Sequence, residues 1–298
     1  MDQRTKSKDK YSRTVAEALR RPRYEVIPPQ GIEEQVVEHV PMDVKLTVTA
    51  SPKKGVEGTL DLSGRLSKEG YEIVPHLSAR LIRDEVHLED VLGRLVEQGM
   101  REIFVIAGDA EEPAGKFEGA GGLLAAMSGL DHGIKEIGIG GYPESHPFIS
   151  DEDTVRAMSE KSPHATYIIS QMSFDAKVVA GWARNVRDRG VDLPIHVGVP
   201  GVVGWQKLVR ISTSIGLGES ARFLKKYGNT FARFFKPGGY NPDGLIKSLT
   251  PAFGDPHGNI RGFHIYTFNE VAKTETWRRK KLASLEAALT SHRDNEES

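Results

Sequence analysis

Short apolar runs alternate along the chain with longer segments in which apolar residues recur at helical spacing. The runs are typical of strands and lie at residues 23–28, 44–50, 72–79, 101–107, 135–142, 165–172, 193–199 and 260–268. Intervening stripes such as Val179, Trp182 and Val186 predict helices that cover a sheet with one apolar face. Strands that alternate with such helices pair in parallel through right-handed crossovers. We therefore expect an α/β fold, a (β/α)8 TIM barrel, with a doubly wound open sheet as its main rival.

The alternation breaks once, between the seventh and eighth strands. The intervening segment is too long for one helix, and its pattern predicts separate helices over 204–215, 219–227 and 242–251. We interpret them as extra helices between strands 7 and 8 rather than as a second domain. The expected organisation is a polar N-terminal extension over 1–20, a single barrel domain over 21–288 and a polar C-terminal tail over 289–298.

Composition and charge narrow the function. The 40 basic and 41 acidic residues nearly cancel, so no overall charge indicates nucleic acid or an anionic membrane as a partner. Cysteine is absent, which excludes disulfides, thiolate metal ligands and a cysteine nucleophile. The polar start resembles no signal peptide, and no apolar run reaches the roughly 18 residues of a membrane span. We expect a soluble, cytoplasmic protein whose ligands are small molecules.

Polar residues recur at the carboxyl ends of the predicted strands. In a barrel these ends surround one mouth, where active sites form. The residues, in chain order, are Glu25, Thr49, His76, Asp109, Tyr142, His146, Gln171 and Tyr266. Their convergence makes this end the candidate site.

Each of these residues also has a purely structural explanation. His76 is as well suited to a buried hydrogen bond, Asp109 to a turn or helix cap, and Asp175 to the N-cap of the next helix. Gln171 is hardest to dismiss, because an amide on a buried strand needs partners for its donor and its acceptor. Glycine-rich segments lack the spacing of a dinucleotide fingerprint or a P-loop, and no HxH or HExxH pair predicts a metal site.

Several segments together resemble the methylenetetrahydrofolate reductase family. "YEVIPP" is similar to the first strand of that family, "PHLSAR" to its third and "VIAGD" to the turn after its fourth. "IGGYPESHP" closely resembles the family's GYPExHP sequence, and "SQMSFD" and "HIYTFN" resemble its TQxFFD and FYTLN segments. The likeness is ordered and runs from about residue 22 to 272.

The resemblance implies a flavoprotein of one-carbon metabolism. Such a barrel uses FAD and NADH or NADPH to reduce 5,10-methylenetetrahydrofolate to 5-methyltetrahydrofolate. Glu25 falls on the family's general acid, and we expect burial to raise its pKa so that it can donate a proton. Asp109 falls on the aspartate that contacts the pterin and influences the flavin. The resemblance also assigns substrate binding to Gln171, Tyr266 and, through an approximate alignment, Trp205.

Cofactor contacts are also implied by the resemblance. The matching positions are Thr49, His76, Gly108, Tyr142, His146 and Lys161. Two departures stand out: Ala107 replaces an arginine that precedes the family's Gly-Asp pair, and Glu270 replaces an arginine after its final motif. The loss of a cationic contact at Ala107 leaves two alternatives open. One is direct, flavin-independent hydride transfer from NAD(P)H, and the other is a non-redox folate-binding protein on the same barrel.

Overall fold

The protein folds as a closed parallel barrel. The computed structural model describes residues 3–28, 31–144, 149–214 and 239–294. Within them each strand pairs with its neighbours in sequence, and β8 returns to β1. The strands are β1 (Arg23–Val26), β2 (Lys45–Val48), β3 (Ile73–Ser78), β4 (Glu102–Ile106), β5 (Glu136–Gly141), β6 (Tyr167–Ser170), β7 (Ile195–Pro200) and β8 (Ile260–Tyr266). The predicted TIM barrel is confirmed, and pairing of β1 with β8 excludes the open sheet.

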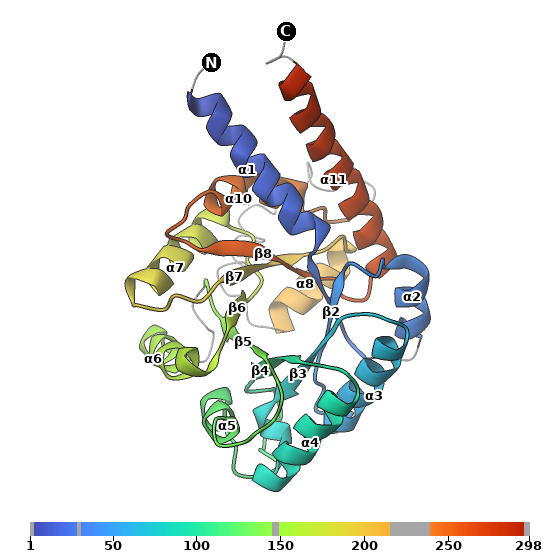
Figure 1. The fold of residues 1–298 in the computed structure, drawn as a ribbon, viewed down its shortest axis with the longest axis vertical. Coiled ribbons are helices and arrows are strands. Elements are labelled where there is room, and N and C mark those ends of the chain that lie inside the picture. Colours follow the sequence, from blue (N-terminus) through green and yellow to red (C-terminus); the bar gives the residue numbers. More distant parts are fainter. Residues whose placement is uncertain (1–2, 29–30, 145–148, 215–238, 295–298) are drawn as a thin grey trace.

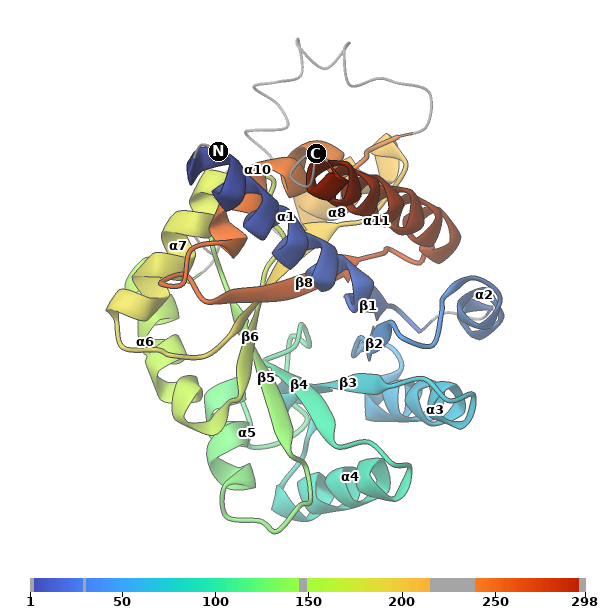
Figure 2. The same cartoon turned by 45° about the horizontal axis from the view of Figure 1, so that its top comes forward.

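Helices surround the ring of strands on its outer side (Figures 1 and 2). They are α2 (Ile32–His39), α3 (Gly55–Lys68), α4 (Glu85–Glu97), α5 (Ala120–Met127), α6 (Asp151–Lys161) and α7 (Ala176–Asp188), with short 3-10 turns at Ala79–Leu81 and Ser162–His164. Helix α7 buries Val179, Ala183 and Val186. The Asp175 side chain accepts from the Lys177 N–H at 2.8 Å, which confirms the predicted N-cap. No helix of the described residues is long and apolar enough to cross a bilayer.

The inserted segment after β7 is helical where the structure describes it. Helix α8 (Trp205–Ser214) and helix α10 (Asp243–Phe253) confirm the first and third helices predicted there. The second predicted helix, over 219–227, lies outside the described residues. An isolated bridge between Val203 and Tyr240 joins the residues just before α8 to those just before α10, so both helices begin near the carboxyl end of β7. This places α8 beside the barrel mouth.

Side chains from alternate strand positions fill the barrel interior. Register places Glu25 opposite Tyr266 and His76 opposite Phe104. Phe104 belongs to a small apolar cluster that is separate from the main core between strands and helices; its buried members are Val74, Phe104, Tyr167 and Ile169. Because these side chains occupy the interior, a ligand has access to the barrel only at its mouth.

A buried ion-pair network closes the opposite end. Arg23, at the start of β1, donates to Glu102 Oε1 at 2.5 Å, and Lys45, at the start of β2, donates to Glu102 Oε2 at 2.5 Å. The Arg23 guanidinium also lies 4.4 Å from the ring centroid of Tyr167. Each of these four residues is the first of its strand, so the network lies at the amino-terminal end of the strands and forms the floor of the barrel.

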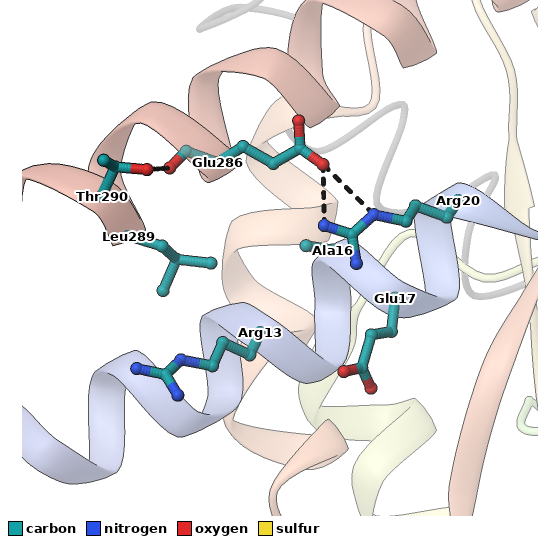
Figure 3. A pocket seen from close by; sticks show the side chains of 7 residues that line it. All are labelled: Arg13, Ala16, Glu17, Arg20, Glu286, Leu289 and Thr290. Carbon is teal, nitrogen blue, oxygen red and sulfur yellow. Dashed lines mark hydrogen bonds and ion pairs between the residues drawn. The ribbon is translucent and has the colours of Figure 1, made fainter. Parts of the chain in front are cut away.

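The two terminal helices pack together outside the barrel. Residues predicted as a polar extension form α1 (Gln3–Arg20), which contacts α11 (Val271–Asp294), α10 and β8. Helix α11 continues past residue 288, where the polar tail was expected to begin. Arg20 donates to Glu286 at 2.7 Å across a cleft of about 280 Å³ between these helices (Figure 3). That cleft contains none of the predicted site residues.

Candidate active site at the barrel mouth

Glu25 lies inside the barrel with two imidazole rings beside its carboxylate. Its Oε2 atom is 3.1 Å from Nε2 of His264 on β8 and 3.8 Å from Nε2 of His76 on β3. The Glu25 side chain is 17% exposed, whereas that of His264 is fully buried. The carboxylate therefore sits just below the mouth, where a ligand would cover its remaining exposed surface.

The pKa of Glu25 differs from the expectation based on sequence. Burial is the largest single influence and raises the pKa, as expected. The hydrogen bond from His264 and the charges of His264 and His76 act in the opposite direction, and the net pKa is lowered. The prediction of a raised pKa is therefore wrong for this arrangement. Its physical reason is His264, a neighbour 239 residues away in the chain.

Two ring nitrogens near Glu25 lack a hydrogen-bond partner. Among the described residues, His76 Nε2 and His264 Nδ1 are both buried and unpaired. Burial lowers the pKa of His76 to about 4 against the opposing charge of Glu25, so its ring is neutral near pH 7. The edge of that ring also packs against Phe104, with centroids 4.8 Å apart. Since buried polar atoms nearly always have partners, an open nitrogen here marks a place for a ligand's polar group.

The end of β8 holds the backbone of β1 in place. Thr267 Oγ1 donates to the Glu25 carbonyl oxygen at 2.5 Å. Asn269 accepts from the Ile27 N–H at 2.9 Å and donates to the Ile27 carbonyl at 3.0 Å. These contacts give the terminal "YTFN" segment a structural function, because they hold the backbone of Glu25 and of Ile27, two residues further along.

Tyrosines connect Glu25 to the opposite rim. Tyr266 packs against His264 with ring centroids 4.8 Å apart and donates from its hydroxyl to the Ser170 carbonyl at 3.2 Å. Burial, then the charges of Glu25 and Tyr142, raise the pKa of Tyr266. Burial and the charge of Asp109 likewise raise the pKa of Tyr142. The charge of Glu25 thus acts on Tyr266, and that of Asp109 on Tyr142.

The loop after β4 carries Gly108 and the exposed Asp109. Gly108 has φ +92°, and a Cβ there would lie 1.8 Å from Ser78 Oγ, so the turn requires glycine. Arg80 holds the same loop, because its guanidinium donates to the carbonyl oxygens of Ala110 at 2.6 Å and Glu111 at 2.5 Å. The sequence analysis assigned no function to Arg80, although it is the last residue of the quoted "PHLSAR" segment.

Gln171 and Trp205 lie on the β6 to β8 side of the mouth. The Gln171 side chain accepts from the Met172 N–H at 2.9 Å, and its backbone N–H donates to Gly141 at 2.7 Å. Trp205, the first residue of α8, packs in an apolar cluster that includes Tyr266. The buried members of this cluster are Met172, Val203, Leu208 and Phe268. Trp205 and Tyr266 therefore pack against the same apolar cluster.

The remaining predicted residues are Thr49, Lys161 and His146. Thr49 follows β2, and its N–H donates to the Val26 carbonyl at 3.0 Å, next to Glu25. Lys161, at the end of α6, donates to the Gly140 carbonyl at 3.2 Å, and burial lowers its pKa. His146 lies outside the described residues. In the described residues, no group of three or more His, Asp or Glu side chains is arranged to hold a metal.

Glu270, which replaces the second family arginine, is held by two lysines. Lys207 of α8 donates to it at 3.0 Å and also to the Phe268 carbonyl at 2.7 Å. Lys273 donates to its other carboxylate oxygen at 2.8 Å. The carboxylate therefore connects α8 to the end of β8. An arginine at this position would face two lysines and could not pair with either.

Solved structures resemble the chain only weakly. A Burkholderia cenocepacia J2315 protein whose crystal structure is described as that of a phosphonomutase covers 94% of this chain and 99% of its own length, with 9% identity and a TM-score of 0.47. A likeness of that size carries no argument about function.

Sequence relatives are more informative. Methylenetetrahydrofolate reductase 1 of Schizosaccharomyces pombe is 28% identical over 158 residues, which are 50% of this chain and 26% of the relative. Methylenetetrahydrofolate reductase 2 of Saccharomyces cerevisiae is 26% identical over 152 residues, 47% of this chain and 25% of the relative. A protein of Oryza sativa subsp. japonica named "Probable methylenetetrahydrofolate reductase (NADH)" is 22% identical over 178 residues, which are 52% of this chain and 29% of the relative. Each match thus spans under a third of the relative's length.

The family model for methylenetetrahydrofolate reductase matches residues 32–227 of the 298. This segment includes Asp109 and Gln171, whereas Glu25 and Tyr266 lie outside it on the two strands that close the barrel. The match covers about two thirds of the chain, and the barrel supplies both remaining strands in the expected order. The chain belongs to the methylenetetrahydrofolate reductase family.

Proposed function

We propose that the protein reduces 5,10-methylenetetrahydrofolate to 5-methyltetrahydrofolate with NADH or NADPH as the electron donor. The observation that carries this proposal is the placement of Glu25: a carboxyl group inside the barrel, largely buried, hydrogen-bonded to His264 and 3.8 Å from His76 Nε2. Membership of the family supplies the substrate class.

Glu25 serves as the general acid in this proposal. The substrate's five-membered ring opens when one of its two nitrogens receives a proton and leaves the bridging carbon as an electrophilic iminium. A pterin that covers the mouth removes water from Glu25, whose side chain is 17% exposed in the structure. Further desolvation raises the pKa of a carboxyl group and so favours the protonated form that can donate.

The rim would orient the pterin. Gln171 offers an amide whose donor and acceptor match the paired nitrogen atoms of a pterin edge. Asp109 precedes the backbone that Arg80 holds, so its loop would present the carboxylate to the pterin. Trp205 and Tyr266 provide apolar and aromatic surface for the rest of the folate.

FAD is the cofactor that the family implies, and three described groups fit it. His76 has an open buried nitrogen for a ring heteroatom, Gly108 exposes its backbone in a left-handed turn, and Lys161 places an amine at the end of β5. Thr49 follows the carboxyl end of β2 and Tyr142 that of β5, at the same end of the barrel. When bound, FAD would carry hydride between the nicotinamide and the folate. The protein's own residues would orient the substrates, limit water and supply the proton.

Ala107 favours a second candidate, in which NAD(P)H passes hydride directly to the folate. This exposed residue stands where the family carries an arginine, so the loop lacks one cation for an anionic cofactor. Lys161, a further basic group on that side, donates to a backbone carbonyl. Glu25 would keep the same function in this route.

One assay with the purified protein tests both candidates. A yellow preparation with flavin absorbance that reduces methylenetetrahydrofolate supports the FAD route. A colourless preparation that oxidises NAD(P)H only when methylenetetrahydrofolate is added supports direct transfer. Failure to form 5-methyltetrahydrofolate with either nicotinamide, and with FAD supplied, would contradict the proposed reaction. Tight folate binding in that case would leave a binding protein without redox activity.

A further inference from the structure

Only one of the two ring nitrogens of His264 has a hydrogen-bond partner among the described residues. Nε2 lies 3.1 Å from Glu25 Oε2, whereas Nδ1 is buried without a partner in the described part of the chain. A ring proton on Nδ1 would be a buried N–H without an acceptor, which costs about 1–3 kcal/mol. With the proton on Nδ1, the lone pair of Nε2 would also point at the carboxylate of Glu25, and neither atom could donate to the other. The geometry therefore favours the tautomer in which Nε2 carries the proton and donates it to Glu25.

No other charged group of the described residues competes for this ring. The titratable groups that face it from neighbouring strands are Glu25 on β1, His76 on β3, His196 on β7 and Tyr266 on β8. Burial lowers the pKa of both His76 and His196 and raises the pKa of Tyr266, so these three are neutral near pH 7. Arg23 and Lys45 act on His196 from the floor and are paired with Glu102.

We propose that His264 is a positioning residue for the proton donor: its Nε2–H keeps Oε2 of Glu25 as an acceptor, so the proton that reaches the substrate is carried on Oε1. The inference rests on the proposed function and assigns that reaction an additional residue. The hydrogen bond from His264 also determines which oxygen of Glu25 carries the proton, because only Oε1 remains available to hold it.

Every proton and electron pair in this step has a defined donor and acceptor. The proton leaves Oε1 and binds the ring nitrogen of the folate, and the carbon–nitrogen bond breaks with its electron pair on that nitrogen. The bridging carbon, now an iminium carbon, gains the hydride and its electron pair that originate from NAD(P)H. Glu25 becomes a carboxylate, and the hydrogen bond from His264 becomes charge-assisted and stronger as that charge develops. Solvent returns the proton to Glu25 after product release.

Two substitutions separate this function from simple packing. His264→Gln places an amide N–H near the position of Nε2 but cannot hold a ring proton, and His264→Phe keeps a ring and removes the donor. We expect the Gln variant to retain kcat within about threefold and the Phe variant to lose about 100-fold, as for removal of one aligned donor. His196→Gln, a second imidazole of the barrel interior that does not touch Glu25, serves as the control with unchanged activity.

The pH profile supplies the readout that a packing effect would not move. The donor lowers the pKa of Glu25, so its loss in His264→Phe should shift the alkaline limb of the activity profile to higher pH. The Gln variant should keep the limb of the wild type. A Phe variant with a lower rate and an unshifted limb, or a Gln variant as impaired as Phe, would overturn the proposal.

Nitrogen-15 NMR of the histidine rings tests the same claim without any substrate and does not depend on the Phe variant folding. The wild-type protein should show a ring proton on Nε2 of His264, and Glu25→Gln should alter its ring shifts. Detection of a ring proton on Nδ1 with none on Nε2 would overturn the proposal. The expected tautomer in a protein that does not reduce the folate would contradict the proposed reaction alone.

Discussion

Asn269 brackets the peptide of Ile27 across the seam between β8 and β1, accepting from its N–H at 2.9 Å and donating to its carbonyl at 3.0 Å. It does so from a left-handed conformation with φ 63°, directly after Phe268 with φ 51°. Two successive side chains in this region are unfavourable, so other interactions must hold them there. The bracket and the bond from Thr267 to the Glu25 carbonyl provide that support.

Substitutions at Asn269 should separate stability from positioning. Asn269→Gly removes the bracket but relieves the backbone strain, so we expect the free energy of unfolding to change by under about 1 kcal/mol. Asn269→Ala loses the bracket and keeps the strain, and should cost about 2–3 kcal/mol. Both should reduce folate turnover by about tenfold or more, because a small misplacement of Glu25 is costly. Urea unfolding and steady-state kinetics measure the two effects. Full turnover in Asn269→Gly would show that the bracket does not position the acid.

The barrel floor should make stability depend on pH. Burial raises the pKa of Glu102, but the charges of Arg23 and Lys45 and further hydrogen bonds outweigh it, and the net pKa is lowered. A carboxyl whose folded pKa lies below its unfolded value stabilises the protein above the unfolded pKa, and this contribution is lost as pH falls through the folded pKa. We therefore expect the free energy of unfolding to decline below about pH 4.5, the ordinary value for this group.

Glu102→Gln tests that assignment. The substitution leaves Arg23 buried without its anionic partner and should cost about 3–5 kcal/mol at pH 7. Glu286→Gln, which breaks the half-exposed pair with Arg20 shown in Figure 3, is the matched control and should cost under about 1 kcal/mol. Equal effects of the two substitutions in thermal or urea unfolding would contradict a structural function for the floor network.

Ala107 determines, in our account, how strongly the barrel holds an anionic cofactor. Its side chain is exposed on the loop after β4, so an arginine fits without displacing a packed group. We expect Ala107→Arg to bind FAD about tenfold to 100-fold more tightly through a charge-assisted hydrogen bond. Stability should change by under about 0.5 kcal/mol. Flavin fluorescence titration measures the affinity; an unchanged dissociation constant would mean that this position does not face the cofactor.

The sequence was sufficient to predict the eight strands and the closed barrel, because each strand carries an apolar run between turn residues and each covering helix has one apolar stripe. The same alternation could also have identified His264. It lies two positions before Tyr266 on the same strand and so points to the same side of β8. The signal was present in "FHIY", but an imidazole within an apolar strand resembles an ordinary core residue.

Contacts between distant segments were beyond the sequence. The pKa of Glu25 depends on His264, and the position of Asp109 depends on Arg80 through backbone carbonyls that carry no residue-specific signal. The register between neighbouring strands decides which of these residues meet. That register is fixed when the barrel closes and not by the conformational preferences of short segments. The sequence therefore predicted a candidate acid, Glu25, but the expected direction of its pKa shift was wrong.

Single-turnover reduction of methylenetetrahydrofolate by Glu25→Gln tests the central claim most directly, because glutamine keeps the size of the side chain and removes only the transferable proton. We expect a loss of about 10²–10⁴-fold in 5-methyltetrahydrofolate formation. The unfolding midpoint and any oxidation of NAD(P)H by added FAD should match those of the wild type. Formation of 5-methyltetrahydrofolate at the wild-type rate by this variant would contradict the assignment of Glu25 as the proton donor.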